Sequence, residues 1–253
     1  MNNFVTNAIN LKSYNLGEND KIIVMYSKEK GLIKGVAKGV KKPKSKLGAR
    51  MDSLVANKLM MFKGKNLDTI CEAQSLNTFK NNRQCLDKLF YSMYVSEIVT
   101  NFGVEDDPNS GEIYDLFYKA LEKIANASGK KDALIGVIKF QLKFMQVAGF
   151  GVELDSCLCC KEQILAENMY FSPKMGGVIC EECNEHLGIK SKMHHKLRDF
   201  LLAMLQFDFN FESDYDRKAT EKVCDVCCEV LKEYVQAHCP KNFKTAKILQ
   251  EVR

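Results

Sequence analysis

The chain has 253 residues, of which 46% are hydrophobic and 27% are charged, and its formal net charge is +5. This composition is ordinary for a soluble globular protein, so we do not expect a disordered chain. There is no run of eighteen apolar residues, and the N-terminus lacks the basic start and apolar centre of a secretion signal, so we expect a cytoplasmic protein without a membrane span.

The positive charge is concentrated in the first third of the chain. Residues 1–80 contain fifteen Lys and Arg against six Asp and Glu, a net charge of +9, which leaves −4 for the remaining residues. The eleven cysteines are an odd number in a chain without a secretion signal, which argues against a disulfide framework and for thiols and metal ligands.

The first eighty residues have the pattern of five short strands. Alternating apolar and β-branched residues predict strands over 4–13, 21–27, 32–40, 54–62 and 67–74, with no helix between them. Five short strands in succession favour a small closed or partly open barrel, and the oligonucleotide-binding (OB) fold is the commonest architecture of this kind.

A basic stretch from Gly31 to Arg50 spans the third strand and the loop after it. Lys34 and Lys38 share one face of the strand, about 13 Å apart, and Pro43 then ends strand pairing, so a flexible basic loop follows. The candidate DNA-binding residues are Lys34, Lys38, Lys41, Lys42, Lys44, Lys46 and Arg50, with no acidic residue among them. A run of cations of this kind binds nucleic-acid phosphates well, because each neutralised phosphate releases counterions. The alternative interpretation is that the lysines only form a charged, solvated surface.

Aromatic residues are scarce in the predicted barrel. Residues 1–80 contain five of them, and the whole chain has no tryptophan. The predicted barrel therefore has few aromatic rings on which bases could stack, which favours contacts mainly to phosphate.

The pattern becomes helical after residue 82. Apolar spacing predicts helices near 86–102, 112–127, 132–148, 197–207 and 220–237. The third of these is apolar on most sides, so we expect it to run through the middle of a helical bundle.

Two C-x-x-C pairs, with nineteen residues between them, lie between the third and fourth predicted helices. Cys157, Cys160, Cys180 and Cys183 have the spacing of a four-cysteine zinc site. Four thiolate ligands leave no open coordination position, so we predict a structural and not a catalytic zinc ion. The alternative is a set of reduced, buried thiols.

Other cysteines and histidines leave the ligand set open. Cys159 is a spare thiol in the first pair, and spacing alone does not exclude it as a ligand. His186, His194 and His195 follow the second pair and could replace a ligand, although solvent-facing histidines are the simpler interpretation. Cys224 and Cys227 share one helix face and are interpreted as small core residues.

Five segments of the chain, in their order and amino-acid sequence, resemble the RecO family of bacterial DNA repair proteins. They are Asn15–Lys21 (NLGENDK), Lys30–Gly39 (KGLIKGVAKG), Lys42–Gly48 (KPKSKLG), Gln146–Phe150 (QVAGF) and the two cysteine pairs with Gly176–Cys180 (GGVIC). The resemblance spans most of the chain, while the helices after Lys190 match only in general character.

The resemblance implies an α+β protein with an OB-fold DNA-binding domain at 1–80 and a helical domain at 81–253, carrying a zinc-binding insertion at about 155–187. It implies a recombination mediator without enzymatic activity, located in the cytoplasm at the nucleoid. Such proteins bind single- and double-stranded DNA, anneal strands coated with single-strand-binding protein, and act with RecR to load RecA. Docking the acidic tail of single-strand-binding protein would need an apolar pocket flanked by lysines in the helical domain.

Two other classes of function compete with this interpretation. A zinc-containing RNA-binding factor shares every electrostatic argument, and comparing affinities for RNA and DNA would separate it. A zinc-lobed enzyme of the deacylase type, or a nucleotide kinase, needs a phosphate-cradling glycine loop, and neither G-x-G-x-x-G nor G-x-x-x-x-G-K-[ST] occurs in the sequence.

Overall fold

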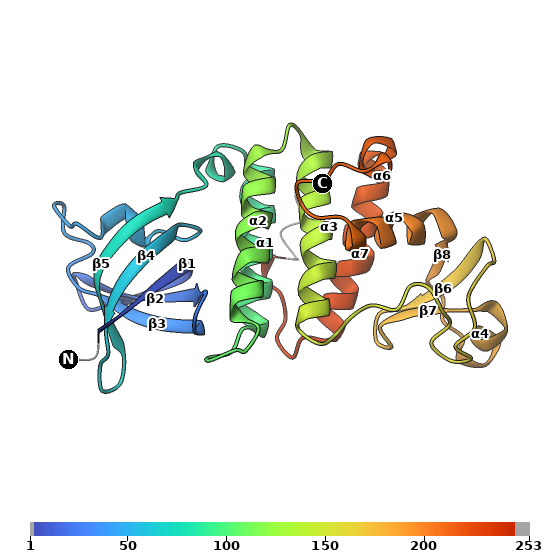
Figure 1. The fold of residues 1–253 in the computed structure, drawn as a ribbon, viewed down its shortest axis with the longest axis horizontal. Coiled ribbons are helices and arrows are strands. Elements are labelled where there is room, and N and C mark those ends of the chain that lie inside the picture. Colours follow the sequence, from blue (N-terminus) through green and yellow to red (C-terminus); the bar gives the residue numbers. More distant parts are fainter. Residues whose placement is uncertain (1–2, 246–253) are drawn as a thin grey trace. The chain divides into compact units, whose positions relative to one another are not determined.

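The computed structural model describes residues 3–245 (Figure 1). The chain forms two compact units, residues 1–125 and residues 126–253. The predicted C-terminal domain runs to residue 253, and its last eight residues, 246–253, lie outside the described part. No helix within residues 3–245 is long and apolar enough to cross a membrane.

Five strands of the first unit close into a barrel in the order β1-β2-β3-β5-β4. β3 and β5 pair in parallel, and all other neighbours are antiparallel. The strands are β1 (Asn3–Leu16), β2 (Asp20–Ser27), β3 (Gly31–Ala37), β4 (Ala56–Phe62) and β5 (Asp68–Asn77). The predicted five-stranded OB-fold barrel is confirmed, and the expected strands differ from the observed ones mainly at their ends.

Side chains of alternating parity fill the barrel. In β3, Ile33 and Ala37 are buried in the core. A Cβ atom at Gly35, between them, would lie 2.7 Å from Cε of Met61 and 2.9 Å from Cγ1 of Ile70. Only glycine fits there without a shift of the core, and Lys34, of the opposite parity, faces outward.

A β-bulge in β1 changes which residues face outward. Asn10 is opposite Met25 and Lys12 is opposite Val24, so Leu11 is an extra residue on β1. Met25 belongs to the core cluster of the barrel, whereas Val24, which is also buried, lies outside that cluster. Since paired residues share a face of the sheet, the bulge places Lys12 and the residues that alternate with it on the outside of the barrel.

Two helices complete the first unit, α1 (Leu86–Phe102) and α2 (Ser110–Asn126). The connection between them is tied to the barrel, because the backbone N–H of Leu32 donates to the carbonyl of Val104 at 2.9 Å. Gly31 makes this approach possible, since a Cβ atom there would lie 2.4 Å from the same carbonyl oxygen. The first unit thus extends beyond residue 80, and the predicted division into functional domains at that residue stays a prediction.

The second unit is built on α3 (Lys130–Val147), which packs against α5 (His195–Gln206) and α7 (Glu221–Ala237). Buried residues occur on most sides of α3, as predicted. A three-stranded sheet follows α3 in the chain, in the order β7-β6-β8. Its strands are β6 (Asn168–Ser172), β7 (Gly177–Ile179) and β8 (Lys192–His194), with α4 (Glu181–Leu187) after β7.

Three short elements of the second unit have no counterpart in the sequence prediction: α4, β8 and α6 (Asp214–Lys218). For α6 the reason is visible in its contacts. Ser213 and Asp216 form a capping box at its start, and the buried ammonium of Lys139 lies 3.5 Å from Oδ1 of Asp216. Lys139 also donates to the carbonyls of Asp208 and Phe211, at 3.1 and 2.9 Å. These long-range contacts fix a helix that is too short to show a periodic pattern.

Candidate nucleic-acid interface and metal centre

The seven cations predicted to bind DNA all have exposed side chains. They are Lys34 on β3, and Lys38, Lys41, Lys42, Lys44, Lys46 and Arg50 between β3 and β4. We call residues 38–50 the basic segment. The prediction placed Lys38 within the strand, but β3 ends at Ala37 and Lys38 begins the turn.

The turn after β3 is fixed by hydrogen bonds to the β1–β2 hairpin. Gly39 has φ +62°, and its N–H donates to Oδ1 of Asp20 at 2.7 Å. The N–H of Lys41 donates to the carbonyl of Asn19 at 3.0 Å, and its ammonium lies 3.3 Å from the carbonyl of Gly17. The first lysines of the basic segment are therefore held beside the hairpin.

The far end of the basic segment is anchored in the barrel. Leu47 and Met51 are buried in its core, and a short 3₁₀ helix, η1 (Gly48–Met51), connects them. The carbonyl of Arg50 accepts hydrogen bonds from the side-chain amides of Asn10 and Asn57, each at 2.8 Å. The exposed lysines thus project from a backbone that is held at both ends.

A second set of outward residues adjoins Lys34, and sequence analysis did not single it out. Two rows run across β1, β2 and β3, because Lys12 pairs with Val24 and Val24 with Lys34, while Tyr14 pairs with Ile22 and Ile22 with Val36. We call these six residues the outer wall; Lys12, Tyr14 and Lys34 are exposed, Ile22 and Val36 are half-buried, and Val24 is buried. The bulge at Leu11 reverses the parity within β1, so Lys12 and Tyr14 face outward although Ala8, an even-numbered residue before the bulge, faces the core.

The four cysteines predicted to hold zinc lie together in the second unit. The sulfur atoms of Cys157, Cys160, Cys180 and Cys183 all lie within 4.8 Å of one another, and those of Cys160 and Cys180 are 3.9 Å apart. Zn–S bonds of about 2.3 Å in a tetrahedron place sulfur atoms about 3.8 Å apart. The four thiols therefore fit a tetrahedral metal ion.

The pKa values of two of these thiols are shifted in opposite directions. Burial raises the pKa of Cys157, but the backbone N–H groups of Cys180, Cys160 and Cys159 outweigh it and lower that pKa to about 6. The pKa of Cys183 is raised, chiefly by the neighbouring side chain of Cys180. Adjacent thiolates repel one another, so a bound cation is what allows all four to ionise together.

The other candidate ligands stand apart from this cluster. Cys159 is exposed, and neither it nor a histidine joins the four sulfur atoms in the described part of the chain. His194 instead caps α5, where its Nδ1 accepts from the N–H of Lys196. Cys224 and Cys227 are buried on α7, and burial raises the pKa of both, in keeping with core residues.

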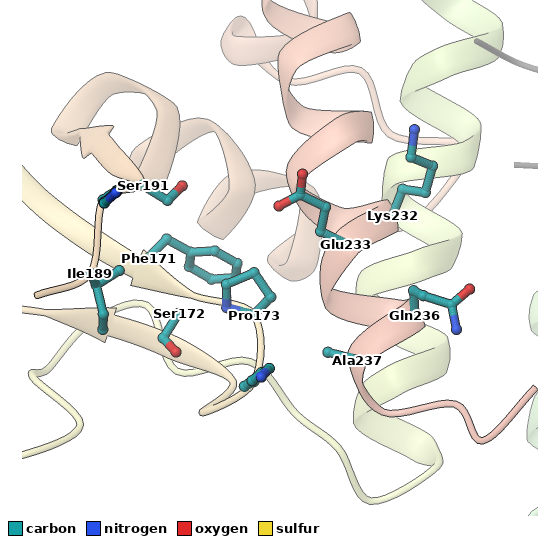
Figure 2. A pocket seen from close by; sticks show the side chains of 11 residues that line it. Phe171, Ser172, Pro173, Ile189, Ser191, Lys232, Glu233, Gln236 and Ala237 are labelled. Atoms are coloured by element: carbon teal, nitrogen blue, oxygen red, sulfur yellow. The ribbon is translucent and has the colours of Figure 1, made fainter. Parts of the chain in front are cut away.

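An apolar groove of about 530 Å³ lies between the three-stranded sheet and α7 in the second unit. Figure 2 shows Phe171 and Pro173 on one side and Glu233 and Ala237 of α7 on the other. Two exposed lysines, Lys174 and Lys190, also border the groove. Lys232 borders it too, but its ammonium pairs with Glu229. Sequence analysis predicted none of these residues, since the groove joins segments far apart in the chain.

Comparison with known proteins gives matches along almost the whole chain. The model of the family "Recombination protein O N terminal" matches residues 1–79, and that of "Recombination protein O C terminal" matches residues 83–247. The chain is 33% identical over 187 residues to the DNA repair protein RecO of Dehalococcoides mccartyi, covering 74% of this chain and 72% of the relative. It is 28% identical over 247 residues to that of Acetivibrio thermocellus, covering 96% and 94%. The chain therefore belongs to the RecO family of DNA repair and recombination proteins, which are mediators and not enzymes.

Proposed function

We propose that the basic segment and Lys34 bind the phosphate backbone of single- and double-stranded DNA, and that the protein thereby anneals complementary strands. The observation that carries this proposal is the exposure of seven cations between residues 31 and 50, a stretch without any acidic residue. Such an arrangement binds phosphates irrespective of sequence. A protein that contacts only phosphates leaves the base edges free to pair with a complementary strand.

The proposed mechanism divides the cations into two groups. Lys34 projects from a strand whose register is fixed on both sides. The lysines of the basic segment project from a loop anchored at Gly39 and Leu47, and their long side chains can follow an irregular backbone. DNA is held without any covalent step, so no residue needs a catalytic role.

The proposal includes the partners that the RecO resemblance implies. The protein would act in the cytoplasm, at the nucleoid, on strands coated with single-strand-binding protein, and with RecR it would help to load RecA. The groove beside α7 supports the first of these partners, because it combines an apolar floor with Lys174 and Lys190 at its border. These are the features that an acidic, apolar peptide tail requires.

We propose further that Cys157, Cys160, Cys180 and Cys183 hold a structural zinc ion. Zinc would join the loop before β6, which contains no helix or strand of its own, to the start of the short helix α4. Four thiolates saturate the metal, so it would stabilise the fold and activate no water or substrate.

RNA remains the competing ligand, because phosphate contacts do not distinguish the two nucleic acids. Membership of a DNA repair family favours DNA. A deacylase-type enzyme is disfavoured by the same membership and by the missing glycine-rich phosphate loop.

Neutralising the start of the basic segment should flatten the salt dependence of DNA binding. For Lys38→Gln with Lys41→Gln and Lys42→Gln, we expect the slope of log K against log salt to fall by about 2, since each lost phosphate contact on a single strand is worth roughly 0.7. Fluorescence anisotropy of a labelled oligonucleotide, at several salt concentrations, measures this slope. A matched variant with Lys196, Lys218 and Lys222, exposed lysines of the second unit, changed to Gln should keep the wild-type slope. An unchanged slope in the first variant would remove the basic segment from the binding surface.

The wild-type protein should accelerate pairing of complementary strands that are pre-coated with the cognate single-strand-binding protein. Lys174→Glu with Lys190→Glu should slow this reaction about fivefold, because the acidic tail of single-strand-binding protein would lose two exposed ion pairs at roughly 0.5 kcal/mol each. Annealing of bare strands should remain unchanged. Glu233→Gln, which removes a negative charge from the groove, should have the opposite effect on coated strands. Failure of the wild-type protein to accelerate pairing contradicts the annealing function, whereas equal effects on coated and bare strands contradict the role of the groove.

Metal analysis separates the two adjacent cysteines of the first pair. The purified protein should contain one zinc ion per chain, Cys160→Ser should lose most of it, and Cys159→Ser should retain it, because only Cys160 lies in the sulfur cluster. Cys180→Ser with Cys183→Ser should lose both the metal and thermal stability, since binding free energy at such sites is largely folding free energy. Undiminished zinc in this double variant would be incompatible with the four-thiolate site.

A further inference from the structure

Tyr14 is a strongly exposed aromatic residue on the outside of the barrel, and the phosphate-binding proposal does not use it. Of the five aromatic residues in the first eighty, Tyr26 and Phe79 are buried and Phe4 packs against the core. The side chains of Tyr14 and Phe62 are 51% and 42% exposed. A single exposed ring on a protein surface is ordinary by itself, so the residues around Tyr14 decide whether it has a ligand.

Tyr14 has apolar neighbours in its own row and cations in the next row. Its row of the outer wall is apolar and half-buried, because Ile22 and Val36 lie beside it in register. The neighbouring row, about 7 Å away along the strands, carries Lys12 and Lys34, both exposed. The ammonium of Lys12 lies 5.7 Å from the centre of the Tyr14 ring.

A nucleotide of single-stranded DNA presents a flat apolar base and a phosphate close to each other. The outer wall offers the complement of both groups, an aromatic ring with an apolar row behind it and cations on the row beside it. Phe62 lacks this combination, since its partners across the sheet are Asn3 and Thr69. Charge and apolar surface together therefore distinguish Tyr14 from the other exposed aromatic residue of the barrel.

We propose that Tyr14 stacks on a base of single-stranded DNA, with Lys12 binding the adjacent phosphate. This inference rests on the proposed function and adds to it a base-contacting residue that selects single strands, because bases of a duplex are not free to stack on a protein ring. The bulge at Leu11 is what turns this ring outward, so it would serve to build the site as well as to shape the barrel.

The chain has no tryptophan, which allows a direct test. Tyr14→Trp and, as the matched control, Phe62→Trp each introduce a single indole into the full-length protein. An oligothymidylate should quench the fluorescence of Tyr14→Trp, while an oligomer of the same length built of abasic sites should not. Phe62→Trp should respond to neither. Equal responses to both oligomers, or equal quenching at both positions, would overturn the stacking assignment.

Affinity measurements separate failure of this inference from failure of the phosphate contacts. Tyr14→Leu should bind oligothymidylate about fivefold more weakly than the wild type, at the lower limit for loss of one stacked base, with an unchanged affinity for the abasic oligomer. Tyr14→Phe should retain wild-type binding of both. If the wild-type protein does not bind the abasic oligomer, the phosphate-binding proposal fails. If it binds that oligomer and Tyr14→Leu leaves the ratio of the two affinities unchanged, only the stacking role of Tyr14 fails.

Discussion

The pairing of β1 with two neighbours is the constraint on which the first unit depends. β1 joins β4 along its first part and β2 along its second, and this double pairing closes the barrel. Closure removes the free strand edges that would otherwise expose unpaired backbone groups. It also requires β1 to bend, and the bulge at Leu11 is the local solution. The same bulge gives Lys12 and Tyr14 an outward direction, so the geometry that stabilises the barrel also determines what its surface presents.

Seven like charges within twenty residues repel one another, and the structure shows how the backbone beneath them is held. Asp20 accepts from the N–H of Gly39 at one end, and the amides of Asn10 and Asn57 hold the carbonyl of Arg50 at the other. The lysine ammonium groups remain in water, where salt screens their repulsion. An anionic ligand would relieve this repulsion.

Features with local signals were predictable from the sequence, and features that depend on distant segments were not. Alternation placed the five strands, and C-x-x-C spacing picked out the four cysteines whose sulfur atoms converge. The helix α6 was missed because five residues are too few for a periodic pattern, and because the contact of Asp216 with Lys139 comes from far away in the chain. The bulge at Leu11 was not foreseen, because the sequence pattern of β1 does not show which residue is the extra one. The groove beside α7 was missed for a related reason, since β6, the segment before β8, and α7 meet only in the folded chain.

We propose that DNA binds to the first unit through Lys34 and the basic segment. Chemical acetylation of lysines, with and without single-stranded DNA and followed by mass spectrometry, reports every accessible lysine of the protein in one experiment. Lys34, Lys38, Lys41, Lys42, Lys44 and Lys46 should become protected when DNA is added, because all six are exposed in the free protein. Lys196, Lys218 and Lys222 should react equally in both states. Protection confined to lysines of residues 126–245, with the basic segment unchanged, would contradict the assignment of the binding surface.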